Sequence, residues 1–381
     1  MKKSLFALAA LSAFTSASFA QSSVTVYGTI DTAVRITDSG TTAINGKTTN
    51  IAGGTLISDR LGFRGVEDLG GGKTAIFQIE SGMAYTDHNA NTSTGAGSSA
   101  TANQPGTLFG ARRPTFVGLS DKALGTLQLG SMYSPGFRFT GFGDVAGTNV
   151  FGTNISQGMV TSSATDTFST GNTTADFKMV ANAASYVSPT FSGANIELFA
   201  SAKETAANGY GGITGAIVNY AYQKLTLQAY TQTLQATNAT TTVATKANNW
   251  GVGAGYDFGI VNTRLSYQKN KYNDQIPSAA ITVTKVSVAA PVTKTVLLHA
   301  GYAQMEDSAL GTLYKASGTT AKANVVNVGA VYTLSKRTNL YANYAKLSQG
   351  TSDKFLLSGS ASATTAGLSP SQVAVGVRHT F

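Results

Sequence analysis

Few side chains in this chain could carry out covalent or metal chemistry. The 381 residues include no cysteine, which excludes disulfides, thiol nucleophiles and cysteine-ligated metals. Three histidines (His88, His299 and His379) leave little scope for imidazole chemistry. The segment Gly70–Thr74 resembles a phosphate-binding loop, but Glu67 stands where that motif needs a glycine. We therefore expect no catalytic residues, no metal and no cofactor.

The spacing of the arginines says more about function than the position of any candidate nucleophile does. Arg60 and Arg64 lie four residues apart, so on a β-strand they share one face. Arg35 shares a face with Asp31 in the same way. A β-strand would hold these charges on one face.

Residues 1–20 have the features of a secretory signal peptide. Two lysines precede the apolar residues 4–14, and small residues favour cleavage before Gln21. The apolar run is too short for a membrane anchor. We therefore expect residues 21–381 to form one exported domain. Loss of two of the 27 basic residues, against 18 acidic ones, leaves a net charge of +7, which favours anions or an anionic membrane surface as partners over nucleic acid.

Apolar and polar residues alternate along the mature chain. Near the C-terminus Val373, Val375 and Val377 share one face, and the residues between them share the other. Because successive side chains of a strand point to opposite sides, a period of two predicts strands with one apolar and one polar face. Charged residues make up only 12 % of the chain, and the apolar runs are too short for membrane-spanning helices.

Sixteen strands are predicted, and short and long connections tend to alternate between them. The strands are expected at 22–36, 55–66, 73–82, 107–119, 126–133, 177–188, 194–203, 213–222, 225–233, 246–257, 260–271, 280–290, 292–304, 323–334, 337–347 and 371–381. Long polar stretches fall at 37–54, 83–106, 134–175, 234–245, 305–322 and 348–369. This alternation is typical of outer-membrane β-barrels, which have tight periplasmic turns and long outer loops.

An even number of strands allows the first to pair with the last. Closure matters because an open sheet edge leaves backbone groups unpaired in hydrocarbon. The alternative, a soluble β-sandwich, accounts for the alternation but not for the signal peptide, the loop asymmetry and the terminal Phe381 together. The prediction is an all-β protein, a 16-stranded antiparallel transmembrane barrel, and a barrel of that size encloses an aqueous channel.

Six segments resemble the Gram-negative general porins of the betaproteobacterial type. They are Ser23–Gly28, Ser58–Gly70, Phe116–Leu119, Tyr186–Gly193, Tyr332–Thr338 and Val375–Phe381. The resemblance spans the mature chain. It implies a homotrimer in the outer membrane that passes small hydrophilic solutes and ions by passive diffusion. It also implies contacts with membrane lipid, lipopolysaccharide and the outer-membrane assembly machinery, and a third outer loop that folds into the barrel.

The resemblance also suggests residues for the pore constriction. The basic cluster of the family maps onto Arg60, Arg64, Arg112 and Arg113, and at least one of the last two should face the lumen because neighbours on a strand point oppositely. Further candidates are named by their position: Arg35 and Asp31 share a strand face, and Arg138, Asp144 and Asp166 lie in the long stretch 134–175. A positive excess at a narrow pore raises the local concentration of anions.

Two positions depart from the family pattern. Ser131 follows Leu129 and Gly130 where relatives often carry arginine, which predicts a weaker basic cluster. Pro114 lies inside the expected fourth strand. Because proline cannot donate a hydrogen bond to the sheet, we expect a bulge there or a strand that begins after it.

The last strand is expected to serve as the assembly signal. Phe381 ends the chain, and Val375 and Val377 lie on the same apolar face.

We interpret the protein as a general diffusion porin with a modest anion preference. The alternatives are a substrate-specific channel, an outer-membrane protease that uses Asp87 and His88, and an adhesin. A substrate-specific channel would need aromatic residues along the lumen or a dense ladder of basic residues.

Overall fold

The computed structural model describes residues 23–381 except for 41–45, 84–110, 146–178, 203–209, 238–243, 272–279, 309–319, 354, 356 and 358–366. The expected signal peptide, together with Asp87, His88 and Asp166, lies outside the described residues. Within them, no helix is both long and apolar enough to cross a membrane.

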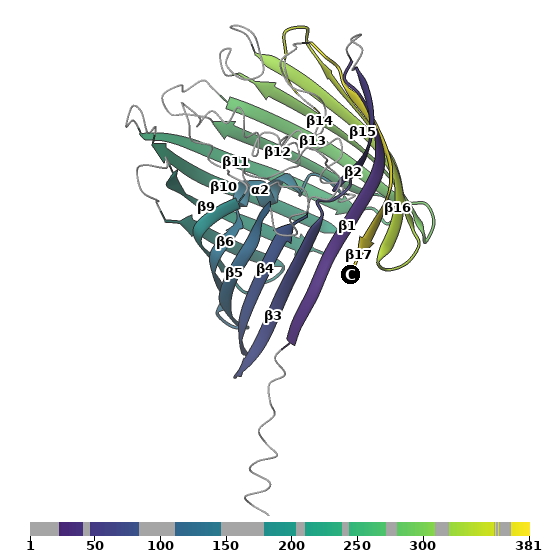
Figure 1. The fold of residues 1–381 in the computed structure, drawn as a ribbon. Coiled ribbons are helices and arrows are strands. Elements are labelled where there is room, and N and C mark those ends of the chain that lie inside the picture. The colour runs from purple at the N-terminus through teal and green to yellow at the C-terminus, as the bar shows by residue number, and fades with distance from the viewer. Residues whose placement is uncertain are drawn as a thin grey trace, which may run out of the picture.

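Strands make up most of the described residues, and they close into a barrel (Figure 1). The strands are β1 (Ser23–Asp38), β2 (Lys47–Gly53), β3 (Arg60–Gly70), β4 (Lys73–Gly82), β5 (Ala111–Asp121), β6 (Gly125–Tyr133), β7 (Met179–Val187), β8 (Ala194–Ser201), β9 (Tyr210–Tyr222), β10 (Leu225–Thr237), β11 (Ala244–Asp257), β12 (Asn262–Lys271), β13 (Ala280–Pro291), β14 (Val296–Asp307), β15 (Ala321–Thr333), β16 (Thr338–Gln349) and β17 (Ser371–Thr380). A short helix, α2 (Pro135–Thr140), follows β6 and lies inside the ring of strands (Figure 1).

The ring of described strands has 16 positions although it contains 17 strands. Both β2 and β3 pair with β1, β2 along its outer half and β3 along its first residues, so together they fill one position. The pairing of β1 with β17 closes the ring, and every pairing is antiparallel. The predicted 16-stranded barrel is therefore confirmed.

The second barrel position is where the predicted strands differ most from the structure. A strand was expected over 55–66, after a long loop, but residues 47–53 are already strand and residues 54–59 interrupt the ladder. Elsewhere the expected strands match the observed ones within a few residues. The short turns lie at one end of the barrel, together with the start of β1 and the end of β17, and the long connections lie at the other.

Pro114 produces the bulge that the sequence predicts. The pairing of β4 with β5 shifts between Ile79 and Ser81, so that Glu80 faces Arg113 and Pro114 together. A bulge allows proline into a sheet because the extra residue makes no ladder hydrogen bond.

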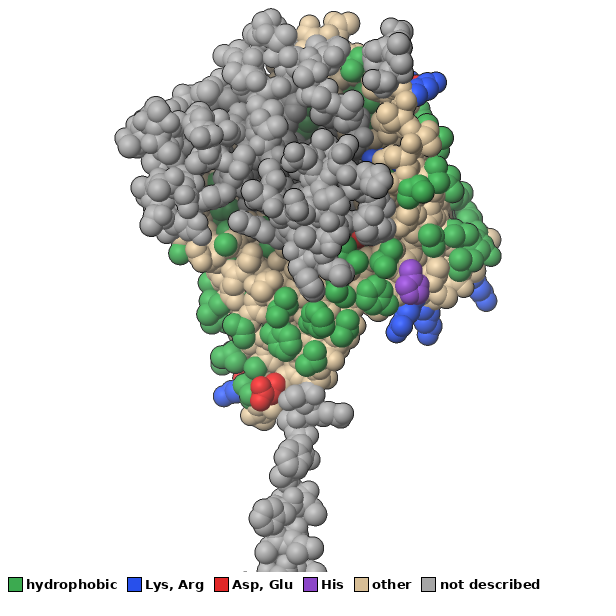
Figure 2. Space-filling model, viewed as in Figure 1, with side chains coloured by type: hydrophobic (Ala, Val, Ile, Leu, Met, Phe, Trp, Pro, Cys, Tyr) green, Lys and Arg blue, Asp and Glu red, His purple; other side chains and the backbone are tan. Residues whose placement is uncertain are grey.

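The two faces of the wall differ in polarity. On β1, Val24, Val26 and Ile30 are exposed on the outside, whereas Thr29 and Asp31 are buried on the inside. Figure 2 shows hydrophobic side chains over much of the outer wall, with basic side chains gathered near its lower rim. An apolar belt around a polar interior is the arrangement expected of a barrel in a membrane.

One part of the inner wall is apolar, near the end that carries the long connections. Phe355 and Leu357, which follow β16, are buried in a cluster with inward-facing residues of β13 to β16 such as Val283, Val325 and Leu347. The connection between β16 and β17 therefore turns into the mouth of the barrel at these two residues.

Candidate functional site

Arg60 and Arg64 lie on the inner face of β3. They pair in register with Thr29 and Thr25 of β1, which belong to the inward-facing set. Arg64 is exposed, and its guanidinium lies over the ring of Tyr27, 5.3 Å from the centroid. A cation held on an aromatic face keeps its charge available to the lumen.

Arg113 also reaches the lumen, but it has an anionic partner. Its guanidinium forms a buried ion pair with Glu80 of β4, and the Tyr27 hydroxyl donates a 2.9 Å hydrogen bond to the same carboxylate. Arg60 lies near enough to Arg113 to repel it electrostatically. Arg112 pairs in register with Ser81, and its side chain is outside the described part of the structure.

Asp31 lies on the inner face but is fully buried, so it differs from the lumen-lining charge that the sequence suggests. Its carboxylate accepts hydrogen bonds from the Tyr341 hydroxyl at 2.5 Å and from the amides of Leu56 and Ile57 at 2.5 and 2.7 Å. Its own amide donates to the Asp59 carboxylate at 2.6 Å. Asp31 therefore holds the interruption between β2 and β3, immediately before Arg60.

Two further arginines lie on the same wall. Arg378 of β17 pairs in register with Asp31 and interacts with it electrostatically. Arg35 pairs in register with Asn50 of β2 and Ala374 of β17. The sequence pattern places Arg378 on the polar face of the last strand, but the sequence gives no reason to select it for the pore.

The segment 134–145, which contains α2, crosses the inside of the barrel. Ser134 caps the helix by accepting a hydrogen bond from the Phe137 amide. The Gly136 amide donates to the side chain of Gln232 on β10 at 2.8 Å. Arg138 forms an ion pair with Glu197 of β8. The expected inward folding of the third outer loop is therefore confirmed over these residues.

Aromatic packing holds the same segment against β10 and β11. Phe139 is buried, with its ring centroid 4.7 Å from Tyr230 and 6.2 Å from Phe142. A Cβ atom at Gly251 of β11 would lie 2.6 Å from the Phe139 ring. Glycine at 251 therefore leaves the space that this ring occupies.

Polar side chains of β12 and β13 hold the end of the segment. Lys285 donates to the Thr140 carbonyl at 2.6 Å, and Arg264 donates to the Phe142 carbonyl at 3.2 Å. Asp144 is buried and interacts electrostatically with Arg264, Lys285 and His299. These basic groups anchor the loop.

Asp144 and the arginines of β3 lie on different sides of the lumen. Asp144 interacts with residues of β12 to β14, which are far from β3 in the ring. By sequence, the candidates for the pore constriction include Arg60, Arg64, Asp144 and Asp166. The structure places Asp144 among cations of its own wall, and Asp166 lies outside the described residues.

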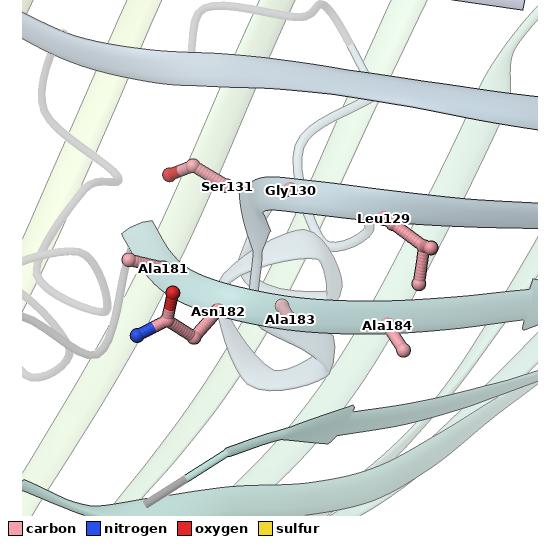
Figure 3. A pocket seen from close by; sticks show the side chains of 7 residues that line it. All are labelled: Leu129, Gly130, Ser131, Ala181, Asn182, Ala183 and Ala184. Atoms are coloured by element: carbon pink, nitrogen blue, oxygen red, sulfur yellow. The ribbon is translucent and has the colours of Figure 1, made fainter. Parts of the chain in front are cut away.

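Ser131 lies at an irregular place between β6 and β7. Its register with Thr115 places it on the outer side of the wall, and Ala181 and Asn182 of β7 bulge opposite it. A shallow depression lined by Leu129–Ser131 and Ala181–Ala184 lies at this position (Figure 3). This position therefore lies outside the lumen cluster.

Comparison with known proteins decides the family. The model of a family described as Gram-negative porin matches residues 7–352. The chain is a Gram-negative porin. An outer membrane porin of Bordetella pertussis is 30% identical over 433 aligned residues, which cover 100% of both proteins. As a member of this family, the porin resides in the outer membrane.

Solved structures agree with the fold. The anion-selective porin from Comamonas acidovorans is 25% identical, with a TM-score of 0.70, over 95% of this porin and 100% of that chain. OmpT of Vibrio cholerae, in its trimer form, is 15% identical with a TM-score of 0.61, over 94% of this porin and 99% of that chain. The second likeness shows the fold alone.

Several charged residues of the lumen are not among the candidates that the sequence predicts. They are the acids Glu80 and Glu197 and the cations Arg264, Lys285 and Arg378. Strand alternation places Arg264 on a polar face, so a signal existed for its orientation. Its contact with a carbonyl about 120 residues away has no local signal.

Proposed function

We propose that this porin is a general diffusion channel for small hydrophilic solutes, with a modest preference for anions. The observation that carries the proposal is the charge balance of one wall. Five inward-facing arginines of β1, β3, β5 and β17 are described on this wall against four acids, and Arg64 is exposed to the lumen. The arginines are Arg35, Arg60, Arg64, Arg113 and Arg378, and the acids are Asp31, Asp59, Glu80 and, at the short turn that ends β3, Asp68. Arginine stays charged at any physiological pH.

The preference for anions over cations should be several-fold, and cations should still pass. The ion pairs of Arg113 with Glu80 and of Arg138 with Glu197 cancel part of the lumenal charge. Salt screens the remainder over about 8 Å at physiological ionic strength. Transport by diffusion needs no reaction and no cofactor, so we propose no catalytic role.

The proposed assembly is a homotrimer in contact with outer-membrane lipid, lipopolysaccharide and the assembly machinery. Family membership supports the trimer, and the OmpT comparison includes a trimeric porin of the same fold. The proposed assembly signal comprises Phe381, Val375 and Val377, whose side chains are exposed on the outer face of the closing strand and at its end.

The test is the zero-current potential of single channels in a planar bilayer with a salt gradient. Replacing Arg60 and Arg64 by serine should shift this potential toward cation preference, with a larger shift at low salt. Lys294→Ser with Lys336→Ser removes the same charge from exposed turns and should leave it unchanged. An unchanged potential in the arginine variant at low salt would place both side chains outside the conduction path.

A further inference from the structure

Residues 54–59, which connect β2 to β3, fold into the lumen, and we call them the spur. Leu56 of the spur is buried in a cluster with inward-facing residues of β1, β16 and β17, namely Ala33, Tyr341, Ala345 and Ala374. In the ring, β1 and β17 lie between this connection and β16. Leu56 therefore reaches the cluster only from inside the barrel, and the spur lies across the inner wall.

Hydrogen bonds to Asp31 of β1 hold the spur in this position. The ladders of β1 with β2 and with β3 both stop short of Asp31. The Gly54 amide donates to the Asp31 carbonyl at 2.8 Å, and the Asp31 amide donates to the Asp59 carboxylate at 2.6 Å. The amides of Leu56 and Ile57 donate to the Asp31 carboxylate. Because backbone groups inside a membrane wall need partners, the gap in the ladder requires the spur to stay folded inward.

The spur and the segment 134–145 lie on opposite sides of the lumen. The spur covers β1 and β17, whereas α2 packs on β10, which is halfway round the ring from β1. The two meet one level of the channel at Arg60, which follows the spur directly and interacts electrostatically with Tyr133. Tyr133 stands just before the segment and contacts Phe137 of α2, with ring centroids 4.8 Å apart. The open lumen at this level is therefore bounded by the spur and by the segment.

Two side chains of the spur are in contact with the open lumen. Thr55, Leu56 and Asp59 are buried, whereas Ile57 and Ser58 remain partly exposed. A β-branched side chain such as that of Ile57 is stiff about its first torsion, so it forms a fixed edge.

We propose that the spur is a second wall of the pore constriction and that Ile57 is one of the residues that limit the size of permeating solutes. The inference rests on the proposed diffusion function and deepens it. It assigns part of the size limit to the wall that carries the arginines, whereas the segment 134–145 forms the other side.

A single cysteine tests the proposal, because the chain has none of its own. The Ile57→Cys porin is recorded in a planar bilayer and treated with a methanethiosulfonate that carries a trimethylammonium group. The mixed disulfide should cause a loss of single-channel conductance, and a reducing agent should restore it. A reagent that carries a sulfonate should also lower conductance. The two adducts should shift the zero-current potential in opposite directions, because they add opposite charges beside Arg60.

Two further cysteine variants complete the test. Gln128→Cys is the matched control, because Gln128 is a partly exposed residue on the inner face of β6, near the end with the short turns. Its labelling should leave conductance nearly unchanged. Ser58→Cys tests the neighbouring position of the spur and should lose conductance on labelling, independently of any change at the isoleucine.

Mass spectrometry of the same samples measures how completely each thiol reacts. An Ile57→Cys thiol that does not react, or one that reacts completely while conductance stays unchanged, would overturn the proposal. The unlabelled native porin tests the proposed diffusion function separately, through its own conductance and its uptake of small sugars. A native porin that conducts, together with an insensitive Ile57→Cys variant, would refute the role of the spur alone.

Discussion

Glu80 accepts hydrogen bonds from both Tyr27 and Arg113 inside the lumen. This carboxylate neutralises one arginine of the wall. We predict that Glu80→Gln makes the channel more anion-selective, because Arg113 loses its anionic partner while the side-chain volume is kept. The zero-current potential in a salt gradient measures the change, which should be largest at low salt.

Glu306→Gln is the matched control for this charge change. Glu306 is also paired with a basic side chain, but it faces outward on β14. Its removal should leave the zero-current potential as it is. A Glu80→Gln channel with native selectivity would show that Arg113 does not act on the permeating ions.

Asp31 stabilises the barrel at the interruption between β2 and β3. Its carboxylate accepts three hydrogen bonds while fully buried, from Tyr341, Leu56 and Ile57. Asp31→Ala leaves these donors without their acceptor, and each unsatisfied buried group costs about 1–3 kcal/mol. We expect the barrel to unfold at a clearly lower temperature in SDS, whereas Asp38→Ala, at a partly exposed residue, should have little effect. If the Asp31→Ala variant kept the heat stability of the native porin, the interruption between β2 and β3 would not depend on the Asp31 carboxylate.

Sequence patterns predict the orientation of residues better than their partners. Alternation predicts that Arg60 and Arg64 share a face, and proline chemistry predicts the bulge at Pro114, because both depend on neighbouring residues. The pair of Arg113 with Glu80 joins residues 33 apart, and that of Asp31 with Tyr341 joins residues 310 apart. No local pattern specifies such contacts, so free and neutralised charges look alike in the sequence.

The segment 134–145 is the element that most directly shapes the channel. Phe139 and Phe142 seat it against Tyr230 and Arg264 on the inner wall. We predict that replacing both phenylalanines by serine loosens this seat, because burial of each ring stabilises it by roughly 1.5–3 kcal/mol. Single-channel recordings should show more open-channel noise, and larger sugars should enter faster.

A phenylalanine outside the lumen provides the control. Phe191, in the turn between β7 and β8, is 82% exposed, and Phe191→Ser should leave conductance and sugar uptake unchanged. If the Phe139, Phe142 variant also kept native conductance and size limit, polar anchors such as Lys285 would suffice to hold the segment.

Period-two patterns locate most strands because each strand exposes one face to lipid and one to the lumen. The second barrel position fails this rule at residues 54–59. There the backbone turns to meet the Asp31 carboxylate instead of continuing the ladder. The long stretch 134–175 is predicted to fold inward only through the family resemblance, since its composition alone is that of any polar loop.

Closure of the barrel depends on the seam between β1 and β17. Residues from Thr29 to Asp38 pair along it. Beyond the ladder, the Gly28 amide donates to the Phe381 carbonyl at 3.1 Å, and the Phe381 amide donates to the Gly28 carbonyl at 3.2 Å. The last residue of the chain thus completes the seam at the end with the short turns.

The Phe381 ring gives the seam a requirement that can be tested apart from any recognition of the chain end. A Cβ atom at Gly28 would lie 2.4 Å from this ring, so Gly28→Val must displace it. We predict that deletion of Phe381 and Gly28→Val both lower the amount of folded, heat-modifiable porin in outer membranes. Ala254→Val, on the outer face of β11, is the control and should assemble normally.

Gly28→Val keeps the terminal phenylalanine, so normal assembly of this variant with failure of the deletion would assign Phe381 to recognition alone. Normal assembly of both would remove Phe381 from either role, because the ladder from Thr29 to Asp38 would then suffice to close the barrel.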